Sequence, residues 1–385
     1  MEIEQFDSIS KIDPAEWDHL AGDDVLYSHA WLSIVEACPL EKADFFYLLV
    51  RENGKLLGAA ACRIHLSNDS ASLDDSFYGR ASGLARAVGF SAAPAIVVGS
   101  RFGFSPPFLL DRELTDSHAE EIEAALIRRI VEDAELSKAT VMVRNATRST
   151  AARALAREGF LATPELPTTY IDIRWNTFAA FIHDLRNVHR ATVKGIRHQI
   201  SRAKREGIVI ERITDPALLS AEVYEVLDQH HRRLNGVPIP FSRELLPEVL
   251  RNLGDDAELI VASDGSRVLG AMFGLRRGGV LHAMIVGTAT ERARTTDTYF
   301  LMLDHMMARA IESGDRRLYY GRLVYAVKMR RGCSIEDSML WIRGRSKLHR
   351  AGLKRITPIR NIRVTRMIRA LEPVSQSNAA ALQGP

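Results

Sequence analysis

The feature of this sequence that most constrains its fold is a hairpin pattern that occurs twice, about 200 residues apart. Residues 53–59 read NGKLLGA, and residues 264–271 read DGSRVLGA, with one additional residue. Each pattern lies between two apolar runs, and Asn-Gly and Asp-Gly accept the positive φ of a tight hairpin turn. Any two β-hairpins can look alike, but the elements around these two also recur in one order: helix, hairpin, helix, strand. We therefore predict an α/β fold with a duplicated domain rather than a solenoid of short repeats.

Length and cysteine content limit the class of protein. With 385 residues, of which 46% are hydrophobic and 26% charged, the chain is long enough for two globular domains. Cys38, Cys62 and Cys333 are odd in number and far apart, which argues against a disulfide framework or a zinc site and fits a reducing cytoplasm. The first residues are partly acidic without an apolar segment, and no run of about 18 apolar residues occurs. We therefore expect a cytoplasmic protein with neither a signal peptide nor a membrane-spanning helix.

Apolar periodicity, caps and turn residues divide the chain into alternating helices and strands. In the first half we expect helices at 14–38, 117–136 and 149–159 and strands at 45–50, 56–64, 139–143 and 170–173. In the second half we expect helices at 177–205, 221–234, 241–253 and 299–311 and strands at 208–213, 257–262, 268–276, 280–286 and 317–320. The second half thus repeats the plan of the first.

The helix expected at 177–205 is strongly basic. It carries seven Arg and Lys residues, Arg197 among them, against the single acid Asp184, and its apolar residues have helical spacing. A basic helix is usually a solvated surface. Its charge equally suggests an anionic partner, and neutralising several phosphates would make such binding sensitive to salt. Both interpretations stay open.

Residues 287–297, GTATERARTTD, precede the helix at 299–311. Arg292, Arg294 and Thr295 are donors that could bind a phosphate at the start of this helix. The segment lacks the glycines that make a tight backbone cradle.

Residues 319–333, YYGRLVYAVKMRRGC, follow a short aromatic strand. Tyr325 and Lys328 are three residues apart and share a face if the backbone there is helical. Lys328 lies between Val327 and Met329, and such a half-apolar lysine is suited to hold a polarised oxygen at the mouth of a cleft. The alternative is a surface lysine beside a packed tyrosine.

The helix at 221–234 carries Asp228 and the pair His230 and His231. Two histidines could shuttle protons, but no partner is visible and their spacing is not that of a zinc motif. A structural role for the pair is favoured, and no metal site is expected. No residue is a convincing general base, and Asp228 is the candidate that remains.

A strand, Gly321, Tyr325-x-x-Lys328 and Gly332 in this order resemble the late motif of the FemABX-type, GNAT-like acyltransferases. That group includes peptidoglycan aminoacyltransferases and BioF2-like proteins, and the resemblance covers most of residues 1–345. It implies two tandem GNAT-like domains with mixed, largely antiparallel central sheets, at residues 1–170 and 171–345. A basic C-terminal tail at 346–385 would follow, and the composition after Pro373 predicts disorder.

The resemblance implies a bacterial N-acyltransferase or aminoacyltransferase that forms an amide bond in a cleft between the two domains. An ammonium group would stabilise the oxyanion of the collapsing intermediate. Lys328 and Tyr325 are the catalytic residues that both their setting and the resemblance favour, and Asp228 is the remaining candidate for the base. The expected substrate- and donor-binding residues are Arg292, Arg294, Thr295, Tyr320, Gly321 and Arg197.

The acyl donor and the acceptor stay open at this point. A standard GNAT has a glycine-rich pyrophosphate loop at the position of residues 287–297. This chain lacks those glycines, which favours a donor other than acetyl-CoA. Aminoacyl-tRNA and acyl-CoA are both retained as co-substrates, and no tightly bound cofactor is expected. The acceptor would be a small-molecule or cell-envelope amine of peptidoglycan or natural-product biosynthesis, and tRNA could be a partner. The alternative is a non-catalytic GNAT-like protein that binds an anionic ligand.

The tail has a charge pattern of its own. Residues 343–371 contain ten Arg and Lys, and no acid occurs between Asp337 and Glu372. Val364, Met367 and Ile368 are among the residues that give the tail an apolar stripe. It could form a basic amphipathic helix that contacts an anionic membrane or nucleic acid, or a helix that packs on the body of the protein.

Overall fold

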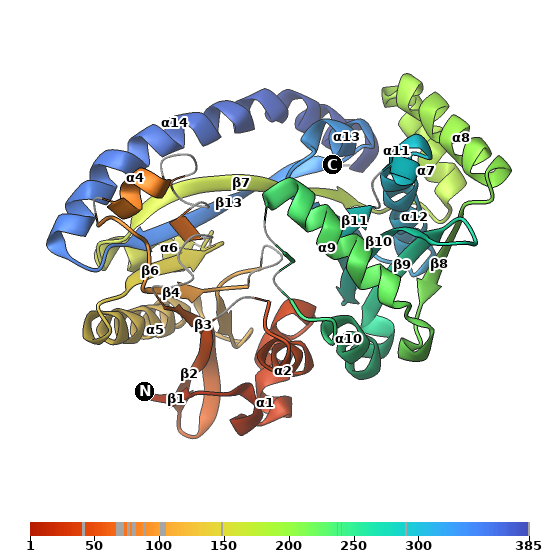
Figure 1. Cartoon of the computed structure of the whole chain (residues 1–385). Helices are drawn as coiled ribbons and strands as arrows, with labels where there is room; N and C mark the ends of the chain where they lie inside the picture. Colours follow the sequence, from red (N-terminus) through yellow and green to blue (C-terminus); the bar gives the residue numbers. More distant parts are fainter. Residues whose placement is uncertain are drawn as a thin grey trace. The chain divides into compact units, whose positions relative to one another are not determined.

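The computed structural model describes residues 1–40, 43–66, 73–74, 78, 82–87, 89–100, 105–147, 149–236, 238–239, 241–288 and 291–383. The chain forms two compact units, whose helices and strands are labelled in Figure 1. Unit 1 comprises Met1–Leu166 and Asp337–Arg369, and unit 2 comprises Pro167–Glu336 and Ala370–Pro385. The predicted domains end at residues 170 and 345, whereas unit 1 takes its last strand and most of a long helix from residues 337–369.

The sheet of unit 1 is mixed. Its strands are β1 (Glu2–Phe6), β2 (Asp44–Glu52), β3 (Lys55–His65), β4 (Ala95–Val98), β5 (Phe108–Leu110), β6 (Thr140–Arg144) and the latter part of β13 (Ser334–Arg343). They are ordered β1-β2-β3-β4-β6-β13, and β5 pairs with β3. Only β4 and β6 pair in parallel, and the other pairs are antiparallel. The turn between β2 and β3 uses Asn53 and Gly54 at positive φ, as the sequence predicts.

Helices cover this sheet with their apolar faces. They are α1 (Pro14–Ala21), α2 (His29–Ala37), α4 (Ser82–Ala87), α5 (Asp116–Leu136), α6 (Ser149–Arg157) and the first part of α14 (Lys347–Asn378). In α5, Ile122, Leu126 and Ile130 recur every fourth residue, so they share one face and are fully buried in the core of unit 1. Leu340 and Ile342 of β13 and Leu353 of α14 complete a second buried cluster.

The sheet of unit 2 repeats this arrangement. Its strands are the end of β7 (Leu161–Asp172), β8 (Val209–Ile213), β9 (Ala257–Ser263), β10 (Val268–Arg277), β11 (Val280–Thr288) and β12 (Arg317–Gly321). They are ordered β7-β12-β11-β10-β9-β8, and only β11 and β12 pair in parallel. Each unit therefore has one parallel pair, joined through a long helix. This confirms the predicted fold of two GNAT-like domains with mixed, largely antiparallel sheets.

The helices of unit 2 lie on both faces of its sheet. They are α7 (Phe178–Val188), α8 (Arg190–Arg205), α9 (Ala221–Asn235), α10 (Leu245–Leu253), α11 (Glu291–Thr295), α12 (Thr298–Glu312) and α13 (Tyr325–Arg330). Met302 and Met306 of α12 pack with Met272 of β10 in the main core. On the opposite face α9 approaches β11 so closely that a Cβ at Gly287 would lie 2.8 Å from Leu227 Cα, so this position requires glycine.

Two parts of the chain differ from the sequence-based prediction. The single helix expected at 177–205 is two helices, because His189 leaves the helical region at φ −131° and ψ 58°. The end of the chain, expected to be disordered after Pro373, is helical to Asn378 and continues as a π-helix at Ala379–Gln383. The reason is tertiary: the Asn378 amide donates hydrogen bonds to the Met329 and Cys333 carbonyls, and Leu382 is fully buried.

None of the helices in the described residues has both the length and the apolar character needed to cross a membrane. No three His, Cys, Asp or Glu side chains among them come together as a metal site.

Candidate functional site

A cavity of about 550 Å³ lies in unit 2 where β11 ends and α12 begins. It lies at the position of the repeated fold where the sequence analysis expected phosphate-binding residues. Its lining includes Arg233 of α9, Thr288 of β11, Glu291 and Arg294 of α11, and Asp297 and Phe300 beside and within α12. The mixture of two arginines with two carboxylates gives it groups for both an anion and an amine.

The strands beside this cavity stop pairing before they end. β11 and β12 pair only over residues 280–282 with 317–319, and His282 opposite Tyr319 is the last pair. β11 continues to Thr288 with β10 on its other edge. Backbone N–H and C=O groups of the unpaired edge are available to a ligand.

Arg233 is held at the cavity by His230. The His230 Nδ1 accepts hydrogen bonds from the Arg233 guanidinium at 2.8 Å and from the backbone N–H of Thr288 at 3.2 Å. Because Nδ1 accepts both, the neutral ring carries its hydrogen on Nε2. Burial and then the positive charge of Arg233 lower the pKa of His230, which favours this neutral form. In this arrangement His230 positions the guanidinium of Arg233.

The start of α12 faces the same cavity. Asp297 precedes the helix in the left-handed conformation at φ 57°, and its side chain makes no capping hydrogen bond. The first N–H groups of a helix without a side-chain cap can donate to an anion. Arg202 of α8 lies 3.9 Å from the Asp297 carboxylate and offsets its charge.

A smaller hollow of about 190 Å³ shares Phe300 with this cavity, so the two adjoin. Arg331 lines it and donates to both oxygens of Asp304, at 2.7 and 3.1 Å. The Arg331 guanidinium also lies 5.1 Å from the centre of the Phe300 ring. Burial raises the pKa of Asp304 although Arg331 opposes that shift. This ion pair holds Arg331 against Phe300, the residue that both hollows share.

Lys328 lies on α13, but its ammonium group is occupied. Its side chain is buried, at 4% exposure, and Nζ donates to the carbonyls of Tyr320, Gly321 and Arg322 at 2.7, 3.3 and 3.1 Å. Burial lowers the pKa of Lys328 to about 8, and the three acceptors favour its charged form. The predicted residues Lys328, Tyr320 and Gly321 thus come together, in a contact that fixes the chain where β12 leaves the sheet.

The other two catalytic candidates are also engaged. The Tyr325 hydroxyl donates to the Pro167 carbonyl at 2.7 Å. Asp228 accepts from Arg232 at 2.7 Å and from the backbone N–H of Ile239 at 2.8 Å. Burial alone would raise the pKa of Asp228, but these two hydrogen bonds outweigh it and hold the pKa below its usual value. A carboxylate that is bonded at both oxygens and has a lowered pKa is a weak general base.

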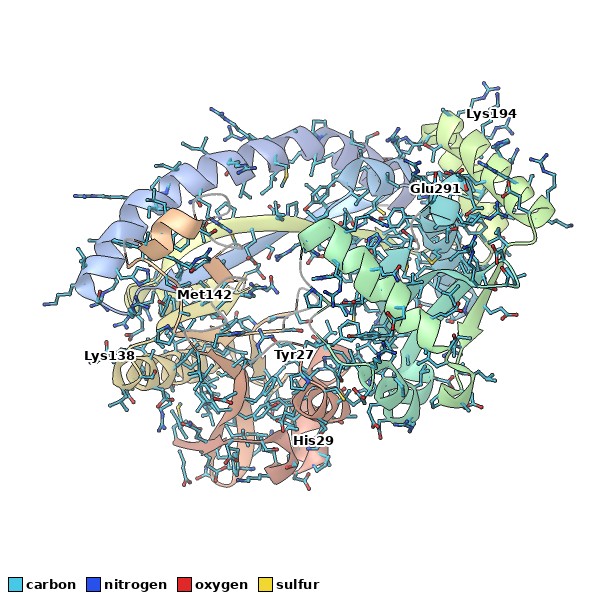
Figure 2. All side chains as sticks on the ribbon, viewed as in Figure 1. Tyr27, His29, Lys138, Met142, Lys194 and Glu291 are labelled. Carbon is cyan, nitrogen blue, oxygen red and sulfur yellow. The ribbon has the colours of Figure 1, made fainter. Side chains whose placement is uncertain are left out.

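The predicted binding residues divide into two groups. Arg294 lines the cavity, with its guanidinium 3.8 Å from Glu291. Arg292 instead lies 3.2 Å from the Glu206 carboxylate, and the Thr295 hydroxyl donates to the Arg292 carbonyl within α11. Arg197 is exposed on α8, as is Lys194 one turn before it, whose side chain extends from the surface in Figure 2. The Tyr320 hydroxyl is buried and donates to the Leu303 carbonyl.

The sequence analysis missed Arg233 and a buried polar cluster around His282. The His282 ring stacks on Tyr319 at 5.0 Å between ring centres, and its Nδ1 is buried without a hydrogen-bond partner among the described residues. Burial lowers its pKa to about 4. The Tyr319 hydroxyl donates to Glu336 at 2.8 Å. The only available signal was a lone histidine in an otherwise apolar strand, which does not by itself distinguish a functional residue from a structural one.

Comparisons with known proteins agree with this architecture. Residues 190–329 match the family model described as an acetyltransferase (GNAT) domain. A search of curated proteins found no match.

Solved structures with a similar fold include three at low sequence identity. FemX is 13% identical with a TM-score of 0.55, covering 89% of this chain and 97% of its own. L-PGS from Bacillus licheniformis is 14% identical with a TM-score of 0.51, covering 92% and 96%. A tandem GNAT protein from the clavulanic acid biosynthesis pathway is 12% identical with a TM-score of 0.51, covering 90% and 99%. Residues 190–329 therefore match a GNAT domain, and the chain as a whole has the tandem GNAT fold of these solved structures.

Proposed function

We propose that this chain is an acyltransferase that moves an acyl or aminoacyl group from an activated donor to an amine and forms an amide bond. The observation that carries this proposal is the cavity in which Arg233 and Arg294 meet the start of α12 beside the unpaired edge of β11. Aminoacyl-tRNA and acyl-CoA both carry phosphates as well as an activated carbonyl, and this cavity offers donors for the phosphates.

The chemistry needs positioning more than it needs a covalent nucleophile. The neutral amine attacks the carbonyl carbon, a C–N bond forms, and the C–O or C–S bond to the donor breaks. The oxyanion in between is stabilised by hydrogen-bond donors. Backbone N–H groups of β11 beyond His282 supply donors at the required edge. The amine proton leaves to solvent or to the departing group.

Lys328 has a positioning role in this proposal. Its three N–H donors already bind carbonyls, so its ammonium is not free to meet an oxyanion. It holds residues 320–322, the segment that follows the last pair between β11 and β12. Asp228 positions the α9 end that carries Arg232 and does not act as the base.

A donor assay tests the proposal. The full chain is incubated with labelled charged tRNA or acyl-CoA and a panel of amines, and amide formation is followed by mass spectrometry. Arg233→Ala and Arg294→Ala should each raise the KM for the donor roughly tenfold or more and change kcat little, since a charge-assisted contact contributes about 1.5–3 kcal/mol.

Arg251→Ala is the matched control, because Arg251 lies on α10, pairs with Glu248 and does not line the cavity. If neither donor transfers its group while the chain still binds CoA or tRNA in an Arg294-dependent way, the protein is the non-catalytic anion-binding alternative.

A further inference from the structure

The first part of α14, from Lys347 to Arg369, has two distinct faces and belongs to unit 1. His349, Leu353, Thr357 and Ile368 are buried, at intervals of one turn and then three turns of the helix. At 100° per residue, six exposed residues besides Lys347, Ala351 and Pro358 lie within about 60° of the line opposite Leu353. They are Leu348, Arg355, Ile359, Ile362, Arg366 and Arg369, which we call the outer stripe of α14.

The apolar members of the outer stripe are unusually exposed. Leu348 is 74% exposed, Ile359 72% and Ile362 54%. From Leu348 to Ile362 they extend over roughly 21 Å of helix at 1.5 Å per residue. Single exposed apolar residues are ordinary, but three large ones along one line of a helix mark a surface that contacts another apolar phase.

The charge of this face has one sign. No acid occurs between Asp337 and Glu372. Arg355, Arg366 and Arg369 of the stripe have no carboxylate partner among the described residues, and neither do Lys354 and Arg363 at its flanks. The face therefore presents basic groups that are free to pair with an anionic partner. The apolar side chains between them would be stabilised by transfer out of water.

We propose that the outer stripe of α14 binds the surface of an anionic lipid membrane. Such a surface matches both halves of the stripe: lipid phosphates attract the arginines, and the acyl-chain boundary takes up Leu348, Ile359 and Ile362. A nucleic-acid backbone would pair with the arginines but would leave the three apolar side chains in water. A second copy of the chain would bring like charges together. The helix lies flat on the membrane, held to unit 1 by its buried face.

Vesicle sedimentation tests this proposal. The full chain is mixed with vesicles of phosphatidylcholine alone or of phosphatidylcholine with phosphatidylglycerol, at low and high salt. We expect binding to the anionic vesicles only, weakened by salt. The double variants Ile359→Ser/Ile362→Ser and Arg355→Gln/Arg366→Gln should each reduce binding roughly tenfold or more.

Leu218→Ser and Arg251→Gln provide matched controls, because both are exposed residues of unit 2 outside α14 and should leave binding unchanged. Circular dichroism confirms that each variant is folded. The proposal is overturned if the wild-type chain does not bind anionic vesicles, or if the isoleucine variant binds them like the wild type. A different result would assign the face to nucleic acid. In that case the chain would not bind vesicles but would bind tRNA, and the arginine variant would lose tRNA binding while the isoleucine variant kept it. The acyl transfer proposed above is measured on a soluble amine without vesicles. Its result therefore tests the proposed function separately from membrane binding.

Discussion

At the scale of the residue, the contacts of a side chain decide what its chemistry can contribute. Lys328 has the residue type and spacing of a catalytic ammonium, yet its three N–H donors hold three successive carbonyls beyond β12. Arg294 has the same kind of charge but lines a cavity. An arginine whose N–H donors face a cavity can bind a ligand. A lysine whose three N–H donors are already hydrogen-bonded instead stabilises the chain around it.

Replacing Lys328 by Met tests this assignment. Methionine retains the apolar stem and leaves the carbonyls of Tyr320, Gly321 and Arg322 without their shared donor. Unpaired buried acceptors should lower the free energy of unfolding by about 2–4 kcal/mol, measured by urea denaturation. Lys194→Met, on an exposed lysine of the same unit, should change it little. If the Lys328→Met protein is as stable as the wild type but has lost its turnover, the result would support the predicted role of the Lys328 ammonium in stabilising the oxyanion.

His282 should make unit 2 sensitive to acid. Burial lowers its pKa from 6.5 to about 4, so as the pH falls below about 6.5 the unfolded chain binds a proton before the folded chain does. The stability is therefore fully present above pH 6.5 and is lost towards pH 4, by about 3 kcal/mol. His282→Phe retains a ring against Tyr319 and should reduce the pH dependence of urea unfolding between these values. His198→Phe, on an exposed histidine, should leave that dependence as in the wild type.

Sequence-based reasoning found some of the site residues and not others for a physical reason. Arg294 could be found because it precedes a helix at a fixed place in a repeated plan. Arg233 reaches the same cavity from α9, and only the packing of α9 on β11 brings it there. Sequence spacing does not encode that packing. His282 was missed because a single histidine barely changes the pattern of a buried strand.

At the scale of the element, strong local signals were sufficient. The two hairpins, α5 and α12 were predicted to within a few residues, because turn residues and apolar spacing are properties of the local chain. The end of α14 was predicted wrongly, because its order depends on Asn378 and Leu382 contacting distant residues. Composition predicts whether an isolated segment is disordered, but it does not predict the tertiary contacts that can order the segment in the folded chain.

At the scale of the whole molecule, the two units share one chain in an unusual order. The last strand of the chain, β13, completes the sheet of unit 1 beside β6, and the end of β7 from the first half pairs with β12 in unit 2. A duplicated sequence pattern predicts two copies of a fold but does not predict which strand completes which copy. Each copy should therefore depend on residues far away in the sequence.

A fragment of residues 1–170 should consequently fail to fold. It lacks the strand that pairs with residues 141–144 of β6, and it lacks Leu340, Ile342 and Leu353 of the buried cluster. The open edge of β6 should cause aggregation, detected by size-exclusion chromatography. Residues 1–166 joined through a flexible linker to residues 337–369 restore these partners and should give a monomer with cooperative urea unfolding. A soluble 1–170 fragment with equally cooperative unfolding would show that unit 1 does not need β13, and the dependence argued from strand pairing would be wrong.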